Sequence, residues 1–339
     1  MLDTVLVMGT GSWGTAAAGL VSENARRVVM WAHSPEVAES INEQHTNPRH
    51  LRDYVLPATI AATSDAAEAV RGADAIVIAV PSNHLRNVLG GFVGLVGEDV
   101  PMLVLTKGIE PGSHLLMTEV VSDVLGNPGR VAALSGPNHA EEVCQGRVSA
   151  AVVGSERASV SSLFQGLFLS RRFRVYRTDD LRGIEVCAAV KNVIAIASGV
   201  CAGTSLGDNA LAVLMTRGLA EMSRVVHAMG GNPMTCMGLA GMGDLVATCT
   251  SQHSRNRTFG EAFARGESLA SYERRTGMVV EGARTALSAW ELACELSIEA
   301  PLTTAVHAIL YGNARLDEVV DSLLDRRARV EFYGLTTNE

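Results

Sequence analysis

The stretch Gly9-Thr10-Gly11-Ser12-Trp13-Gly14 decides the fold, because it follows the apolar run 4–8 and opens a helical pattern over 15–23. In a strand–turn–helix, the first glycine permits a tight turn, the second lets the backbone approach a pyrophosphate, and the third lets helix and strand pack closely. The helix N-terminus adds free N–H groups and a positive dipole end. The spacing alone is weak evidence, since any glycine-rich turn can match it. Its place at the start of a β-α-β pattern favours a dinucleotide site over a structural turn.

Short apolar runs alternate with helical patterns through the first half of the chain. The expected strands cover residues 4–8, 27–31, 75–80, 102–106, 131–134, 150–153 and 173–176. The expected helices include 15–23, 35–44, 83–89 and 160–168. Continuous apolar strands separated by helices are typical of a parallel sheet covered on both faces. We therefore predict an α/β fold whose residues 1–180 form a Rossmann-type, doubly wound, mainly parallel domain that binds a dinucleotide.

The pattern changes near residue 181, where strand-like runs disappear and helical periodicity dominates. The expected helices cover residues 183–198, 209–229, 255–264, 282–296, 303–310 and 316–325. A chain of 339 residues is also long enough for two domains. Residues 181–330 are therefore expected to form a mainly α-helical C-terminal domain that carries the substrate and the catalytic groups.

Composition narrows the class of protein. A hydrophobic content of 47% predicts a well-buried globular chain, and a net charge of −8 argues against nucleic acid as the main partner. No apolar run approaches the roughly 20 residues that span a bilayer, so membrane insertion is not expected. The six cysteines form no C-x-x-C pair and match no zinc spacing. We expect reduced thiols in a cytoplasmic protein, with no signal peptide and no metal.

The second expected strand bears on the choice of dinucleotide. NAD-selective sites usually place an acid about 20 residues after the glycines, where it binds the ribose 2′-hydroxyl. Here the strand ends Met30-Trp31-Ala32-His33-Ser34, and the first acid is Glu36. His33 would not repel a 2′-phosphate, and Arg26 or Arg27 is a candidate to assist. We expect NADP to be accepted, with NAD as the alternative, and an ordinary loop histidine is the competing interpretation of His33.

The chain holds two lysines, Lys107 and Lys191, among 28 basic residues. Codon bias explains why lysine is scarce but not why these two positions keep it. Arginine cannot give up its proton at usable pH, whereas a desolvated lysine can. Lys107 ends an expected strand, where ligands bind in doubly wound sheets. It is a candidate to reach a phosphate, a carbonyl or an alkoxide, and a surface loop lysine is the alternative.

Lys191 lies in a helix that is apolar nearly all round, so it is expected to be buried. Burying an unpaired ammonium is costly, and the group therefore either pairs or loses its proton. Such a lysine is a candidate general base for an alcohol and general acid for a carbonyl. The alternatives are a lysine that reaches the surface, or one that pairs with Glu185.

At this point the motifs resemble those of the bacterial NAD(P)-dependent glycerol-3-phosphate dehydrogenase family, in order, from residue 4 to about 325. Besides the glycine loop, the matching stretches are Ala79-Val-Pro81-Ser82, Thr106-Lys107-Gly108, Ser135-Gly136-Pro137, Val190-Lys191-Asn192-Val-Ile-Ala-Ile-Ala, Gly207-Asp-Asn209, Thr216-Arg217-Gly218-Leu-Ala-Glu221-Met, Gly241-Met-Gly243-Asp244-Leu, Ser254-Arg255-Asn256-Arg257 and Val279-Val280-Glu281-Gly282. One motif would be weak evidence, but this many in register are specific.

The resemblance implies an oxidoreductase that interconverts dihydroxyacetone phosphate and sn-glycerol 3-phosphate, the backbone precursor of phospholipids. It implies that Lys191 exchanges the proton at the substrate hydroxyl, with Asp244 and Lys107 as further catalytic residues. The implied substrate contacts are Lys107, Gly136, Asn138, Lys191, Asp244, Ser254, Arg255 and Asn256. The implied cofactor contacts, with Gly9, Gly11 and Gly14, are Ser12, Trp13, His33, Lys107, Ala140, Arg255, Val279 and Glu281. A homodimer through the helical domain is expected by analogy.

The residue types suit a phosphate site. Ser254 is a good N-cap for a helix that opens at Arg255, and this helix end can bind a dianion without a metal. Arg257 either adds charge there or faces water. Asp244 either holds the Lys191 ammonium, binds a substrate hydroxyl, or simply caps a helix after a tight glycine turn.

Three positions depart from the family pattern. Asn138 stands where relatives usually have serine or threonine, Ala202 where many have an acid, and Ala189 or Ala188 where a glycine is common. Two rival functions stay open. One is a related lysine-dependent β-hydroxyacid dehydrogenase, against which the phosphate corner argues. The other is a non-catalytic dinucleotide sensor on the same fold.

Overall fold

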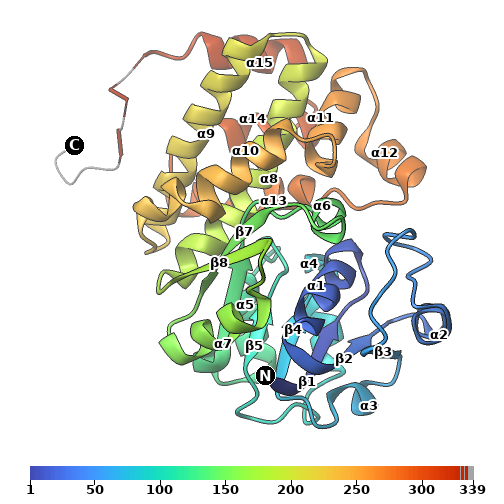
Figure 1. The fold of residues 1–339 in the computed structure, drawn as a ribbon. Coiled ribbons are helices and arrows are strands. Elements are labelled where there is room, and N and C mark those ends of the chain that lie inside the picture. The colour runs from blue at the N-terminus through green and yellow to red at the C-terminus, as the bar shows by residue number, and fades with distance from the viewer. Residues whose placement is uncertain (329, 332, 335–339) are drawn as a thin grey trace. The chain divides into compact units, whose positions relative to one another are not determined.

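The computed structural model describes residues 1–328, 330–331 and 333–334 (Figure 1). By contacts within the chain it divides into two compact units. The N-terminal unit holds Met1–Lys107 and Met117–Leu181, and the C-terminal unit holds Gly108–Leu116 and the chain from Arg182 onward. The short segment 108–116 therefore leaves the first half of the chain and packs with the second.

The N-terminal unit is built on one sheet of eight strands in the order β3-β2-β1-β4-β5-β6-β7-β8. Its strands are β1 (Leu2–Met8), β2 (Ala25–Trp31), β3 (Ile60–Thr63), β4 (Ala75–Ile78), β5 (Met102–Val104), β6 (Val131–Ser135), β7 (Ser149–Gly154) and β8 (Phe173–Thr178). Within the described residues, neighbouring strands run parallel except β6 and β7. The predicted mainly parallel α/β fold is confirmed, and β3 is the strand that the sequence pattern missed.

Helices connect these strands. They are α1 (Ser12–Ser22), α2 (Pro35–Gln44), α3 (Ala66–Val70), α4 (Ser82–Gly90), α5 (Met117–Leu125), the short η1 (Pro128–Arg130), α6 (Ala140–Cys144) and α7 (Ala158–Phe168). Val5 and Val7 of β1 pack in one core cluster with Ala16 of α1, and Leu6 and Met8, which alternate with them along the strand, are also fully buried. Successive strand residues face opposite sides of a sheet, so both faces are covered, as predicted.

The C-terminal unit is helical, as predicted. It contains α8 (Leu181–Gly203), α9 (Asp208–Ala228), the short turns η2 (Pro233–Met237) and η3 (Leu239–Gly243), α10 (Asp244–Thr250), α11 (Arg255–Ala264), α12 (Leu269–Thr276), α13 (Glu281–Glu295), α14 (Pro301–Leu310) and α15 (Leu316–Leu324). A second core cluster joins Val193 and Ile196 of α8 with Phe259 of α11 and Ala283 of α13. The apolar character of α8 on all sides is thus explained by its central place in this packing.

One expectation about α8 is wrong. No apolar run was expected to approach membrane-spanning length, yet this helix has 23 residues and is long and apolar enough by length and composition. In the structure, however, 83% of its most apolar window is buried inside the protein. We conclude that α8 is a core helix.

The segment 108–116 is held on α13 by His114. Its Nδ1 lies 3.0 Å from Glu295 and its Nε2 lies 3.2 Å from Glu291. An isolated bridge between Ile109 and Leu116 closes the segment into a loop. The loop begins directly after Lys107, the last residue of the first part of the N-terminal unit.

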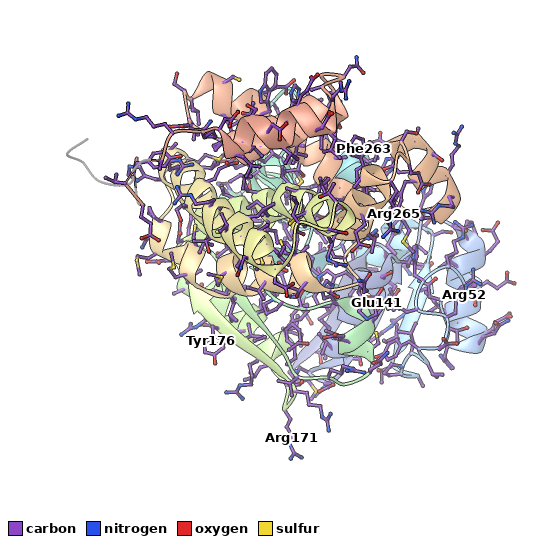
Figure 2. All side chains as sticks on the ribbon, turned by 90° about the horizontal axis from the view of Figure 1, so that it is seen from above. Arg52, Glu141, Arg171, Tyr176, Phe263 and Arg265 are labelled. Atoms are coloured by element: carbon purple, nitrogen blue, oxygen red, sulfur yellow. The ribbon has the colours of Figure 1, made fainter. Side chains whose placement is uncertain are left out.

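Many arginines lie on the surface, as expected for a chain that uses them in place of lysine, although Arg130 and Arg224 are buried. Figure 2 shows Arg171 extending away from the ribbon, and Arg52, Arg171 and Arg265 are all exposed. The surface is therefore supplied with positive charge by arginine, and the two lysines need a separate explanation.

Candidate active site

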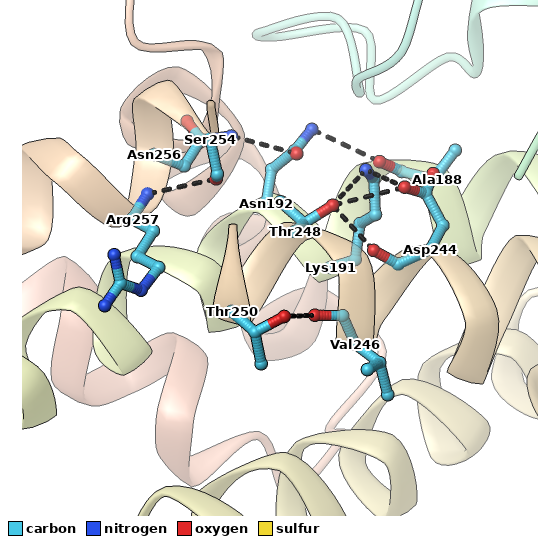
Figure 3. Close-up of polar contacts among 10 residues, drawn as sticks. All are labelled: Ala188, Lys191, Asn192, Asp244, Val246, Thr248, Thr250, Ser254, Asn256 and Arg257. Atoms are coloured by element: carbon cyan, nitrogen blue, oxygen red, sulfur yellow. Dashed lines mark hydrogen bonds and ion pairs between the residues drawn. The ribbon is translucent and has the colours of Figure 1, made fainter. Parts of the chain in front are cut away.

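Lys191 lies at the centre of a buried polar cluster in the C-terminal unit (Figure 3). Its Nζ donates to Oδ1 of Asp244 at 2.6 Å and to Oγ1 of Thr248 at 2.7 Å. The side chains of Lys191 and Asp244 are 6% and 4% exposed. This burial excludes a lysine that reaches the surface, and Lys191 forms an ion pair in which Asp244 favours the charged ammonium.

The local fold explains how Asp244 reaches the lysine. Residues Leu239–Gly243 form a one-turn π-helix, a feature that is frequent at functional sites, and α10 begins at Asp244. A Cβ on Gly241 would lie 2.1 Å from the carbonyl oxygen of Cys236, so only glycine fits. The expected tight glycine turn is thus a π-helical turn. Gly243 rather than Asp244 is the N-cap, so the simple capping role is wrong.

Thr248 completes the cluster, although no sequence motif had singled it out. It lies one turn after Asp244 on α10 and donates to the Asp244 backbone oxygen at 2.6 Å, and it lies 3.1 Å from Oδ1. Residues four apart share a helix face, so the spacing from Asp244 was the available signal. A threonine on a helix is too common for that signal to stand out.

A second set of hydrogen bonds ties three helices together beside Lys191. Nδ2 of Asn256 donates to Oδ1 of Asn192 at 2.9 Å, and the Gly282 N–H donates to Oδ1 of Asn256 at 2.9 Å. Asn192 follows Lys191 on α8, Asn256 lies in the first turn of α11, and Gly282 in the first turn of α13. Asn192, for which the sequence motifs predicted no role, therefore links the lysine helix to the expected phosphate corner.

The expected phosphate corner has the predicted form. Ser254 is the N-cap of α11, and its Oγ accepts from the Arg257 N–H at 3.3 Å. Arg255 is exposed, whereas Asn256 is buried. Arg257 pairs with Glu261 at 2.8 Å, and its side chain is only 12% exposed. Arg257 therefore does not face water, and its ion pair lies along the helix rather than at its N-terminus.

Val279 and Glu281 lie close to this corner through the start of α13. Glu281 opens the helix, and the next residue, Gly282, bonds to Asn256. The preceding turn is fixed by Glu273, whose carboxylate accepts from the Val280 N–H at 2.9 Å. The structure thus brings together the expected cofactor residues 279 and 281 with the expected substrate residues 254–256.

The glycine loop in the N-terminal unit fits a dinucleotide. Gly9 has φ +110°, and a Cβ there would lie 2.7 Å from the Ala79 carbonyl oxygen. A Cβ on Gly14 would lie 2.3 Å from the Gly9 oxygen, whereas one on Gly11 would meet nothing within 4 Å. Two glycines therefore serve close packing, and the open side of Gly11 leaves room for a pyrophosphate. Gly11 is also the N-cap of α1, whose first turn, with Ser12, holds no acidic residue.

Two further donors in this unit have unmet hydrogen-bonding capacity. Nε1 of Trp13 and Nδ2 of Asn138 are buried and have no hydrogen-bond partner among the described residues. Buried polar groups normally find partners, so an unpaired donor calls for an explanation such as a ligand. The asparagine that departs from the family pattern therefore presents a free N–H donor.

The remaining expected residues lie at carboxyl ends of strands or just beyond them. Gly136 follows β6, and a Cβ there would lie 2.6 Å from the Ala150 oxygen, so its glycine serves strand packing. Ala140 begins α6. Lys107 is half-buried after β5, and His33 is exposed after β2. Ligands bind at this edge of doubly wound sheets.

The expectation that Arg26 or Arg27 assists the cofactor is wrong. Both lie near the start of β2, at the opposite end of the strand from His33. Arg26 is paired with Asp3 at 3.1 Å, and residue 27 is aligned with Thr4 near the start of β1. A parallel strand presents its ligand-binding end at its carboxyl terminus, so these arginines are on the wrong edge.

Lys191 and the residues around it, Asp244, Thr248 and Cys249, are all buried. Burial raises the pKa of the nearby Cys249 thiol to about 11, and a hydrogen bond with Ser198 and the charge of Lys191 only partly oppose this rise. All six cysteines are free. Across residues 1–328 and the other described positions, no group of three or more His, Cys, Asp or Glu could hold a metal ion.

A doubly wound sheet with a dinucleotide loop, joined to a helical unit with a buried lysine, defines a nicotinamide-dependent oxidoreductase. Models of the two halves of one family match this chain. The NAD-dependent glycerol-3-phosphate dehydrogenase N-terminus matches residues 4–161, and the C-terminus of the same family matches residues 180–321. The chain belongs to the NAD(P)-dependent glycerol-3-phosphate dehydrogenase family, as the motifs predicted.

Relatives agree over nearly the full length. A glycerol-3-phosphate dehydrogenase (NAD(P)+) of Bacillus pumilus is 42% identical over 336 residues, which cover 98% of this chain and 97% of that protein. The enzyme of the same name from Corynebacterium jeikeium is 43% identical over 96% of this chain and 99% of its own length. The crystal structure of glycerol-3-phosphate dehydrogenase from Coxiella burnetii has a TM-score of 0.91 and 37% identity, covering 96% of this chain and 99% of that one.

Proposed function

We propose that this chain interconverts dihydroxyacetone phosphate and sn-glycerol 3-phosphate with NADP or NAD, and so supplies glycerol 3-phosphate for phospholipid synthesis. The observation that carries the proposal is the buried contact of Lys191 with Asp244 and Thr248. It holds an amine against a carboxylate in a buried site, within a family whose relatives bear this activity in their names. A proton donor of this kind suits reduction of a ketone.

The chain's own residues provide the proton. When bound, the nicotinamide supplies a hydride to C2 of dihydroxyacetone phosphate or takes one from glycerol 3-phosphate. In the reducing direction, Nζ of Lys191 donates a proton to the C2 oxygen, and in the reverse direction it accepts that proton. Asp244 stabilises the ammonium before transfer, and Thr248 fixes the direction of Nζ. Each reduction consumes one proton, which solvent returns to the lysine.

The phosphate end of the substrate is assigned to the start of α11. Ser254, Arg255 and Asn256 present a helix N-terminus and an exposed guanidinium, which together bind a dianion without a metal. Lys107, Gly136 and Asn138 are proposed as further substrate contacts. The buried Nδ2 of Asn138, which has no partner within the described part of the chain, supports this role.

The dinucleotide is assigned to the glycine loop and its surroundings. Gly9, Gly11 and Gly14 shape the turn, and backbone N–H groups of the first turn of α1 hold the pyrophosphate. The remaining proposed contacts are Ser12, Trp13, His33, Lys107, Ala140, Arg255, Val279 and Glu281. We further propose that residues 1–180 act as the dinucleotide domain and residues 181–330 as the substrate domain.

One assay separates this function from its rivals. NADPH absorbance is followed with dihydroxyacetone phosphate, with unphosphorylated dihydroxyacetone, and with 2- and 3-keto acids. We expect rapid oxidation with dihydroxyacetone phosphate alone. Preferred oxidation with a keto acid would support a β-hydroxyacid dehydrogenase instead. NADPH binding without oxidation by any of these compounds would support a non-catalytic sensor.

The setting of the enzyme is also proposed. A homodimer through the helical unit is supported by exposed apolar side chains there, including Val213, Met234, Met237 and Val246. A cytoplasmic location is supported by six free cysteines, which suit a reducing compartment. The molar mass measured by analytical ultracentrifugation at two protein concentrations tests whether the chain forms a dimer.

A further inference from the structure

A polar cluster at the carboxyl end of β2 is not used by the proposed mechanism. Nη2 of Arg49 lies 3.2 Å from Oγ of Ser34 and 3.8 Å from the Glu36 carboxylate. The Ser34 hydroxyl also hydrogen-bonds to Glu36. Ser34 is the N-cap of α2, directly after the strand, whereas Arg49 comes from the loop that follows the helix. The cluster thus places a guanidinium just after β2, where the sequence pattern indicated no nearby basic residue.

The backbone of Arg49 is tied to the glycine loop. Asn47 is fully buried, and its Nδ2 donates to the Thr10 backbone oxygen at 2.7 Å and to Oγ1 of Thr15 at 2.9 Å. Its Oδ1 accepts from the Arg49 N–H at 3.0 Å. The glycine loop in turn lies beside β2, because the Gly9 N–H donates to the Trp31 oxygen at 3.0 Å. The loop that carries Arg49 is therefore anchored to the pyrophosphate turn.

This edge of β2 is where nucleotide-binding folds of this class distinguish their cofactors. An acid at the end of the second strand binds the 2′-hydroxyl of NAD, whereas a nearby arginine accommodates the 2′-phosphate of NADP. Here the strand is followed by Ala32 and His33, and Arg49 reaches the next residue, Ser34. We infer that Arg49 binds the 2′-phosphate and makes this chain prefer NADP to NAD. The inference rests on the proposed function only in requiring a dinucleotide.

The present partner of Arg49 does not oppose this role. Its ion pair with Glu36 is long, and the two side chains are 62% and 77% exposed. Exposed pairs of this kind contribute little. A phosphate dianion offers two oxygens to the guanidinium fork, which makes a stronger and more directional contact. The Arg49 guanidinium can therefore leave Glu36 for a 2′-phosphate at little cost.

The test measures binding of NADPH and NADH to the full chain by fluorescence, with no ketone present. Wild type is expected to bind NADPH more tightly. Arg49→Gln should lower the affinity for NADPH by about tenfold or more, because a charge-assisted contact is lost. It should leave the affinity for NADH nearly unchanged. Adenosine 2′,5′-bisphosphate should displace NADPH better than 5′-AMP from wild type, but not from the variant. Arg26→Gln is the matched control, because Arg26 is an exposed, ion-paired arginine at the other end of β2. It should change neither affinity.

Three results would overturn the inference. They are equal weakening of NADPH and NADH in Arg49→Gln, unchanged NADPH binding in that variant, and a wild-type preference for NADH. If Arg49→Gln does not fold, Arg49→Met keeps the aliphatic stem and removes the charge. The ratio of its affinities for NADPH and NADH then gives the same test. Because no substrate is present, failure to reduce dihydroxyacetone phosphate would contradict the proposed reaction without altering this result.

Discussion

Nζ of Lys191 lies 2.6 Å from Oδ1 of Asp244 in a part of the protein where both side chains are almost completely buried. Two charges in such a place stabilise each other only while both are present. In the proposed mechanism, the proton needed for ketone reduction is stored on Lys191, whose charged form the Asp244 carboxylate stabilises. Because the same contact also stabilises the folded protein, both turnover and the free energy of unfolding have to be measured for each variant.

Lys191→Ala should lower kcat by about 10² to 10⁴-fold, the usual range for loss of a general acid. It should also lower the free energy of unfolding by about 3–5 kcal/mol, because Asp244 is left buried without its partner. NADPH affinity should stay near wild type. Steady-state kinetics, urea unfolding and cofactor fluorescence measure the three quantities.

A double variant separates the two effects. Lys191→Ala with Asp244→Asn removes both charges, so it should be more stable than Lys191→Ala alone and equally inactive. Near-wild-type turnover in either variant would refute the role of Lys191 as the proton donor.

Thr248→Val should lower kcat about tenfold and leave KM nearly unchanged, because it removes one hydrogen bond that directs Nζ. Thr248→Ser keeps the hydroxyl and should retain most of the turnover. The comparison of valine with serine tests positioning rather than packing, since valine preserves the shape. Equal loss in both variants would instead assign Thr248 a packing role.

Arg255→Gln should raise KM for dihydroxyacetone phosphate by about tenfold or more, because a charge-assisted contact to the phosphate is lost. With NADPH held at saturation, because Arg255 is also a proposed cofactor contact, the slow turnover of unphosphorylated dihydroxyacetone should change far less, since that substrate has no phosphate. Arg265→Gln, at the other end of α11, is a matched exposed control. A similar rise in KM for both ketones would show that Arg255 acts on something other than the phosphate.

The fold was largely predictable because its signals are local. The glycine loop, the apolar strands and the long apolar α8 each follow from neighbouring residues. The edge strand β3 was missed because Ile60–Thr63 is only four residues long and lacks the continuous apolar character of its neighbours. The sequence pattern predicted a single boundary near residue 180. In the structure, segment 108–116 also packs with the C-terminal unit, through His114.

The site residues that lie in local sequence motifs could be predicted. Those that come together only through contacts between distant parts of the chain could not. Lys191 stood out as one of two lysines, and Ser254 as an N-cap. Thr248 gains its role only through the contact with Lys191, which is 57 residues away in sequence. Arg49 lies in a loop whose position is set by a buried hydrogen bond from Asn47 to the glycine loop. Contacts between distant loops leave no periodic signal in a sequence.

Glu221 gives a last prediction, about pH and stability. It is fully buried, and its carboxylate accepts from the backbone N–H groups of Leu302 at 2.8 Å and Thr303 at 2.9 Å, and from the Thr303 hydroxyl at 2.6 Å. It thereby caps the N-terminus of α14. Burial raises the pKa of Glu221 above its ordinary value of 4.5, although these hydrogen bonds and Arg224 partly oppose the rise.

A raised pKa means that the folded protein binds more protons than the unfolded chain above pH 4.5. The stabilising contribution of this group is therefore complete below that pH and is lost as pH rises through the folded-state pKa. The side chain in Glu221→Gln does not titrate. The substitution should lower the free energy of unfolding by about 1–3 kcal/mol, because the N–H₂ group of the new amide faces the Leu302 N–H donor instead of an acceptor. The free-energy advantage of wild type over Glu221→Gln should therefore shrink as pH increases from 4.5 toward neutrality. Urea unfolding of both proteins across this range measures the difference, and an advantage that grows with pH would show that the hydrogen bonds outweigh burial.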